Sequence, residues 1–232
     1  MQFAELRVEG YRSLVSVTLA LRPLNVLIGP NGSGKTALLE VFDLLKQAAQ
    51  GNLAESLLRF GGLNAILSRT TQGAGRIKVW LAVDVQDTRR PEPMSYRFEL
   101  VPREINYEIA FERLEWRVVP DAAKPYRYID AHNGEVRYAD PDQRGLVRPT
   151  WDYHTGELAL AQVPRMYEAP ETLRNALAKT RMFSFLDVGY RAVARLPQAL
   201  TPTATPGPNG ENLFSALYNL RALHPGVYDR IE

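Results

Sequence analysis

The chain has 232 residues, of which 45% are hydrophobic and 23% are charged, a mixture typical of folded globular domains. It contains no cysteine, which excludes a disulfide framework, a thiolate zinc site and a cysteine nucleophile. The sequence has neither a membrane-spanning apolar stretch nor the apolar core of a signal peptide, so we predict a cytoplasmic protein with no membrane partner.

The net charge is only +2, although arginine greatly outnumbers lysine among the basic residues. Guanidinium groups match the geometry of phosphate groups, which would favour phosphate or nucleic-acid contacts. A genome whose base composition favours arginine codons would produce the same bias. No dense run of basic residues is present, so charge alone does not indicate DNA binding.

The N-terminal residues predict strands. A first β-compatible run ends at Gly10, and apolar and polar residues alternate from Val15 to Ala20, as in a half-buried strand. Residues 24–28, Leu-Asn-Val-Leu-Ile, form a short apolar run that predicts a buried central strand. An apolar stripe at helical spacing follows from Ala37 to Leu45, and a second helix is predicted over residues 53–60.

Between the predicted central strand and the helix lies the phosphate-binding pattern G-x-x-x-x-G-K-[ST]. Glycines allow backbone N–H groups to converge on phosphate oxygens, and the helix N-terminus favours an anion. The lysine supplies a charge for the β- and γ-phosphates, and the threonine supplies a hydroxyl for Mg²⁺. The predicted nucleotide-binding residues are Gly29, Pro30, Asn31, Gly32, Ser33, Gly34, Lys35 and Thr36, with Thr36 as the metal ligand. The alternative is a glycine-rich turn with an exposed lysine.

From residue 76 the period changes to two, and residues 76–162 predict an antiparallel β region with hairpin turns at 132–135 and 154–157. A helix is predicted over 170–181, a strand over 183–188 and a loop over the proline-rich residues 197–208. An amphipathic helix is predicted over 212–223. These elements give an α/β fold with a large antiparallel portion.

We predict three parts in the chain. Residues 1–75 form a P-loop lobe, residues 76–165 form the antiparallel region, and residues 166–232 begin a further lobe that this chain does not finish.

The sequence of the phosphate loop, together with the preceding residues Gly10-Tyr11-Arg12-Ser13-Leu14, resembles the N-terminal half of an ATP-binding-cassette-type head. It is similar to the RecF, SMC and OLD-type ATPases, which include bacterial proteins called AAA family ATPases. The specific part of this resemblance covers residues 1–70. It implies a P-loop NTPase fold, ATP and Mg²⁺ as cofactors, and heads that dimerise around ATP or pair with a complementary ATPase half. It also implies DNA or a nuclease as a further partner, in DNA repair, DNA maintenance or phage defence.

Arg12 occupies the place where this family often carries a basic residue near the nucleotide. The alternative is a solvated hairpin residue, and the sequence does not decide between the two roles.

The sequence departs from the family in its catalytic motifs. A complete head needs an apolar strand that ends in Asp-Glu and a Leu-Ser-Gly-Gly-type signature, and neither occurs here. Residues 185–188, Phe-Leu-Asp-Val, are the nearest approach to the first motif. The catalytic residues therefore remain unknown, and hydrolysis by this chain alone is doubtful.

Two hypotheses follow. The chain is either part of an ATPase whose catalytic half lies beyond residue 232 or in a second chain, or a module that senses ATP without hydrolysing it. A nucleotide kinase is a weaker third alternative, because the long β region replaces the arginine-rich lid of such enzymes.

Overall fold

A computed structural model describes most of the chain. The described residues are 1–69, 75–85, 92–104, 106–116, 125–140, 145–183, 189–190, 192–197, 199–203, 205–207 and 210–231. They form two compact units, Met1–Thr180 and Arg181–Glu232. The division into three parts at residues 75 and 165 stays a prediction.

The first unit is built on one antiparallel sheet. Within the described residues the sheet has eight strands in the order β2-β1-β3-β4-β5-β6-β7-β8, and every neighbouring pair is antiparallel. The strands are β1 (Gln2–Tyr11), β2 (Leu14–Ala20), β3 (Ile77–Asp84), β4 (Met94–Arg103), β5 (Asn106–Trp116), β6 (Tyr126–His132), β7 (Glu135–Asp140) and β8 (Gly145–Val147). The predicted mixed α/β class with a large antiparallel portion is confirmed.

One face of this sheet carries the core. A row of paired residues crosses six strands and consists of apolar and aromatic side chains, because alternate residues of a strand point to the same face. The row is Leu6, Leu81, Tyr96, Leu114, Ile129 and Tyr138, all of them buried. The period-two pattern in the sequence therefore predicted which side chains form the core of the sheet.

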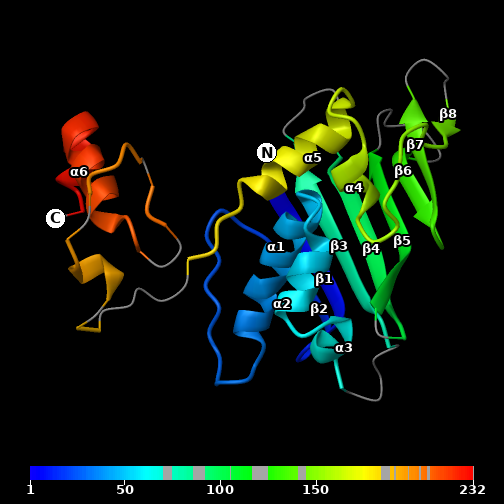
Figure 1. Cartoon of the computed structure of the whole chain (residues 1–232), viewed down its shortest axis with the longest axis horizontal. Coiled ribbons are helices and arrows are strands. Elements are labelled where there is room, and N and C mark those ends of the chain that lie inside the picture. Colours follow the sequence, from blue (N-terminus) through cyan, green and yellow to red (C-terminus); the bar gives the residue numbers. More distant parts are fainter. Residues whose placement is uncertain are drawn as a thin grey trace. The chain divides into compact units, whose positions relative to one another are not determined.

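The helices of the first unit lie on this apolar face (Figure 1). They are α1 (Lys35–Ala49), α2 (Leu53–Arg59), α3 (Leu63–Ile66), α4 (Ala159–Gln162) and α5 (Glu168–Ala178). Helix α1 buries a stripe along its length against the core: Ala37, Leu38, Val41, Leu44, Leu45, Ala48 and Ala49. This burial fixes the position of its first turn, where the phosphate-binding pattern ends.

The opposite face of the sheet carries charged and aromatic side chains. Arg7, Trp80 and Arg97 are direct cross-strand neighbours there. The guanidinium of Arg7 lies 4.4 Å from the centroid of the Trp80 ring, and that of Arg97 lies 4.9 Å from the Phe111 ring. Such cation–π contacts cover aromatic surface on the face opposite the described helices of the first unit (Figure 1).

The second unit contains η1 (Val193–Arg195), α6 (Leu213–Leu223) and α7 (Pro225–Tyr228). The amide of Asn219 on α6 donates to the carbonyl oxygens of Thr201 and Thr203, both at 2.9 Å, and so holds part of the proline-rich loop against the helix. The predicted helix over 212–223 is confirmed, and the one predicted over 170–181 corresponds to α5. Among the described helices, none has the length and hydropathy required to cross a bilayer.

The prediction of a buried strand at residues 24–28 is wrong. These residues have no regular secondary structure, and the exposed fractions of Leu24, Val26 and Ile28 are 79%, 72% and 93%. An apolar run becomes a buried strand only where neighbouring strands pair with it. The eight strands among the described residues pair with one another and leave this segment without a partner strand.

The hairpin predicted at residues 154–157 is also wrong, although the chain does turn there. No strands flank the turn. The side chain of Gln162 holds it instead, because its amide nitrogen donates to the carbonyl oxygens of His154 and Glu157 and its oxygen accepts from the His154 N–H. The sequence also predicts a strand over residues 183–188. Residues 184–188 lie outside the described part of the chain. The hairpin turn at 132–135 is confirmed between β6 and β7.

Two carboxylates connect this turn to the rest of the unit. The carboxylate of Glu157 accepts the N–H groups of Leu53 and Ala54 at 2.9 and 3.0 Å and so caps the start of α2. Glu112 on β5 is fully buried, and its carboxylate accepts the N–H groups of Ala159 and Leu160 at 2.6 and 2.8 Å. These contacts fasten the segment before α5 to both the sheet and α2.

Burial raises the pKa of Glu112 to about 7, although the two N–H groups and the Tyr96 hydroxyl, which donates to it at 2.9 Å, oppose the rise. The carboxyl group ionises near 4.5 when exposed. Between these values the folded chain keeps a proton that the unfolded chain has released, so this group makes folding less favourable as pH rises.

We expect the free energy of unfolding to fall by up to about 3 kcal/mol between pH 4.5 and 7 through this group alone. Glu112→Gln should remove this part of the pH dependence, because the amide does not ionise. Urea unfolding at several pH values measures the slope. Glu135→Gln, which alters a carboxylate whose side chain is 63% exposed on β7, should keep the wild-type slope. Equal slopes for wild type and Glu112→Gln would contradict the assignment.

Candidate nucleotide-binding site

The phosphate-binding pattern forms a loop that leads directly into α1. Gly34 is the N-cap of the helix and adopts a left-handed conformation with φ of 97°. As a glycine it offers no side chain to cap the helix, and the first turn of α1 contains no acidic residue. The N–H groups at the start of this 15-residue helix therefore receive no acceptor from the N-cap side chain or from an acidic residue of the first turn, and the partial positive charge of this end favours an anion.

Lys35 is the first residue of α1, and its side chain folds back over the loop. Its ammonium donates to the carbonyl oxygens of Gly29 and Pro30, both at 2.7 Å, and lies 3.5 Å from the Ser33 hydroxyl. An ammonium group has three N–H donors. Two of them are fixed by strong contacts to the first residues of the loop, and the third, whose contact is long, remains for an acceptor inside the loop.

Thr36 is the second residue of α1 and is exposed. Pro30, Asn31 and Gly32 form the exposed tip of the loop. The structure therefore places all eight residues of the predicted pattern in one loop and the first turn of the helix that follows.

The turn of the β1–β2 hairpin lies against this loop. A Cβ atom on Gly34 would stand 2.7 Å from the Cδ2 atom of Leu14 and 3.0 Å from the Ser13 hydroxyl. Gly10 is equally confined, because a Cβ atom there would stand 2.1 Å from the carbonyl oxygen of Arg76. Glycine is therefore required on both sides of the hairpin, where it contacts the phosphate loop and the start of β3.

Arg12 lies in this hairpin turn, with a left-handed backbone (φ 48°) and an N–H that donates to the Ile66 carbonyl at 2.7 Å. Its guanidinium forms an ion pair with Glu40 of α1, with 2.7 Å between Nε and Oε2, and lies 5.5 Å from the centroid of the Phe60 ring. The structure thus brings Arg12 to the side of the P-loop helix. The side chain of Arg12 is nevertheless 38% exposed, so this ion pair is accessible to solvent.

Tyr11 contributes a second contact to the same carboxylate. Its ring is fully buried, and its hydroxyl donates to Oε2 of Glu40 at 3.1 Å. Burial raises the pKa of Tyr11 far above its usual value, while Arg12 opposes this rise and Glu40 adds to it, so the phenol stays a donor. Sequence reasoning assigned no role to Tyr11 or Glu40. The available signal was the spacing, since Glu40 follows Thr36 by four residues and so shares its side of the helix.

The described residues contain no group of three or more His, Asp or Glu side chains arranged to hold a metal ion. Residues 185–188, the nearest approach in the sequence to an apolar strand that ends in Asp-Glu, lie outside the described residues. The described part of the chain therefore contains the phosphate-binding pattern but not this segment.

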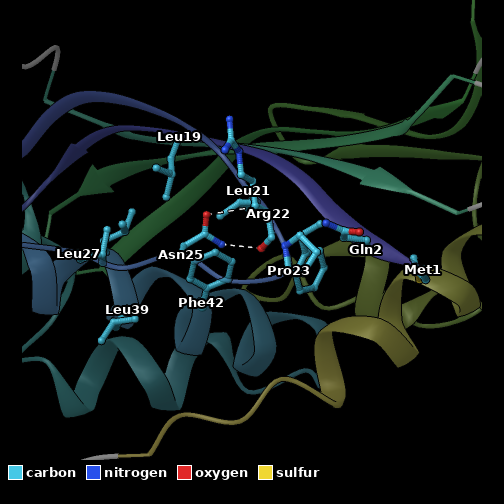
Figure 2. Close-up of a pocket in the computed structure, with 12 residues that line it drawn as sticks. Met1, Gln2, Leu19, Leu21, Arg22, Pro23, Asn25, Leu27, Leu39 and Phe42 are labelled. Carbon is cyan, nitrogen blue, oxygen red and sulfur yellow. Dashed lines mark hydrogen bonds between the residues drawn. The ribbon is translucent and has the colours of Figure 1, made fainter.

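An apolar groove lies beside the exposed segment 24–28 (Figure 2). Its volume is about 420 Å³. The side chain of Asn25 forms hydrogen bonds with the N–H and carbonyl of Arg22 at 3.1 and 2.7 Å at its rim. Apolar side chains from β1, from β2 and the residue after it, from α1 and from the segment itself line the groove: Phe3, Leu19, Leu21, Leu27, Leu38, Leu39 and Phe42.

One comparison with known protein families covers the phosphate-binding pattern. Residues 1–114 match the family model described as an AAA ATPase domain. No curated protein sequence matches the chain.

A solved structure from work on ATP-driven dimerization and DNA-stimulated activation of SMC ATPases matches with a TM-score of 0.37 and 16% identity. The match covers 47% of this chain and 68% of that one. A TM-score of this size is too low to equate the two folds. The family model spans the phosphate loop, and residues 1–114 of this chain are therefore similar to an AAA ATPase domain.

Proposed function

We propose that this chain binds ATP with Mg²⁺ in the loop formed by residues 29–36. The observation that carries the proposal is the position of the Lys35 ammonium, which two loop carbonyls hold at the N-terminus of α1. Backbone N–H groups, a helix terminus and a fixed ammonium together form a site for the β- and γ-phosphates. The exposed hydroxyl of Thr36 is the Mg²⁺ ligand.

The chain acts as the nucleotide-binding part of an ATPase head of the RecF, SMC and OLD type. Arg12 contributes a further cation to the nucleotide. A complementary ATPase half, from a second copy or a second chain, completes the site, and DNA or a nuclease is the downstream partner in the cytoplasm. The motifs of the first 70 residues and the AAA ATPase match support this proposal.

The exposed segment 24–28 supports the need for a complementary half. Leu24, Val26 and Ile28 are too apolar to favour exposure, and fully burying such a side chain contributes about 1.5–3 kcal/mol. The groove beside the segment offers further apolar surface. A strand added along residues 24–28 would cover this surface and bring new side chains next to the phosphate loop.

The alternative is a module that binds ATP as a signal without hydrolysing it. One observation favours it: Glu40 is the carboxylate that α1 holds one turn beyond Thr36, and it is already engaged by Arg12 and Tyr11. A carboxylate held in this way is poorly placed to accept a proton from water. The rate of hydrolysis separates the two functions.

We expect Lys35→Ala to lower the affinity for ATP-Mg²⁺ by about tenfold to a hundredfold. The substitution removes a charge-assisted contact of roughly 1.5–3 kcal/mol. Isothermal titration calorimetry measures the affinity. Lys46→Ala, which removes a lysine from the last turn of α1, is the matched control and should bind ATP as the wild type does. Equal affinities for wild type and Lys35→Ala would exclude the proposed site.

We expect Thr36→Ala to weaken ATP binding more in the presence of Mg²⁺ than in EDTA. The hydroxyl contacts the metal and not the phosphate chain. Calorimetric titrations of both proteins under both conditions give the comparison. A loss of equal size with and without Mg²⁺ would show that Thr36 has another role.

We expect the isolated chain to release phosphate from ATP slowly or not at all. Phosphoryl transfer needs a group that orients the attacking water and positive charge at the transition state, in addition to a phosphate cradle. A phosphate-release assay tests this expectation. Turnover of about 1 s⁻¹, low in the usual enzyme range, that is abolished by Lys35→Ala would show a complete site within this chain.

A further inference from the structure

The hairpin turn that carries Arg12 is fixed in place by its backbone. Besides the contact of the Arg12 N–H with Ile66, the N–H of Ser68 donates to the Gly10 carbonyl at 2.8 Å, and Tyr11 pairs with Leu67 in an isolated bridge. The turn therefore has little freedom to move relative to residues 66–68. The position of the Arg12 side chain is the remaining variable.

Glu40 is in direct contact with the Arg12 side chain. It faces the hairpin from the second turn of α1, and its Oε2 atom contacts both the Arg12 guanidinium and the Tyr11 hydroxyl. The Phe60 ring lies near the guanidinium. An unrestrained arginine at a hairpin tip would sample many rotamers. The carboxylate and the ring select one orientation at the side of the P-loop helix.

The same contact keeps Arg12 close to the phosphate site. Residues 36 and 40 are about one helical turn, or roughly 6 Å, apart along α1. The neighbouring hairpin residue, Ser13, lies against Gly34 at the N-terminus of the helix. A guanidinium has five N–H donors, and one carboxylate oxygen occupies only part of them, so donors remain for an anion. With the side chain of Arg12 38% exposed, an incoming nucleotide can reach it.

We propose that Glu40 is a positioning residue for nucleotide binding: it holds the guanidinium of Arg12 ready for the phosphates of ATP. The proposal rests on the proposed function, because it assumes that ATP occupies the loop. It assigns Glu40 a role in orienting Arg12 and none in contacting the nucleotide.

This arrangement predicts a specific pattern of ATP affinities. Arg12→Ala should weaken binding about tenfold to a hundredfold, as expected for loss of a charge-assisted contact. Glu40→Gln should weaken it about threefold to tenfold, because Arg12 is present but no longer oriented. The double variant should bind about as tightly as Arg12→Ala alone, since Glu40 acts only through Arg12.

Calorimetry on the four proteins gives the double-mutant cycle, and urea unfolding of each separates binding effects from losses of stability. Tyr11→Phe is the matched control, because it removes the other contact of Glu40 and keeps the ion pair; its ATP affinity should stay within about twofold of the wild-type value. If Glu40→Gln fails to fold, Glu40→Asp keeps the charge with a shorter reach and should give an intermediate loss of affinity.

Several results would overturn the proposal. Unchanged or tighter binding by Glu40→Gln would mean that Glu40 does not orient Arg12 for the nucleotide or repels the phosphates. Independent effects of the two substitutions would mean that Glu40 does not act through Arg12, and an unaffected Arg12→Ala would remove Arg12 from the site. Lys35→Ala distinguishes these outcomes from failure of the proposed function: if that variant also binds ATP normally, the loop itself is not the ATP site.

Discussion

The contact between the β1–β2 hairpin and the start of α1 is the constraint on which the candidate site depends. Gly34 has no space for a side chain because Leu14 and Ser13 pack against it. Gly10 allows the same hairpin to approach the start of β3. The hairpin therefore connects the phosphate loop to the sheet. The orientation of Arg12, and the reach of Glu40 toward it, follow from that connection.

The parts of the fold and of the candidate site that could be predicted from the sequence are those whose structure is determined by residues close to one another in the chain. The phosphate loop and α1 were predictable, because the fixed glycines, Lys35 and the apolar stripe act within a few residues. The alternation of residues 77–83 likewise predicted β3, since it reflects two faces of one strand. Residues 24–28 were predicted wrongly because burial of an apolar run requires partner strands. The run itself carries no information about whether those strands exist.

Glu112 illustrates a second limit. Counting by two along β5 places it on the same face as Leu114 and Trp116, so its inward orientation was available from the sequence. The N–H groups that satisfy its carboxylate lie on Ala159 and Leu160, more than forty residues later. Only the three-dimensional structure shows that an acidic side chain at this core position holds a distant segment. Glu157 shows the same limit for a partner that comes earlier in the chain, because it caps α2 from about a hundred residues away.

The exposed segment 24–28 leads directly into Gly29 and Pro30, whose carbonyl oxygens orient Lys35. Under the proposed function, a complementary strand along this segment would restrict the backbone just before the loop. Fewer backbone conformations in the free state mean a smaller entropic cost when ATP orders the loop. Nucleotide binding and docking of the complementary half would then favour each other, because coupling between two sites is reciprocal. The same segment would thus link completion of the catalytic site to occupancy of the phosphate loop.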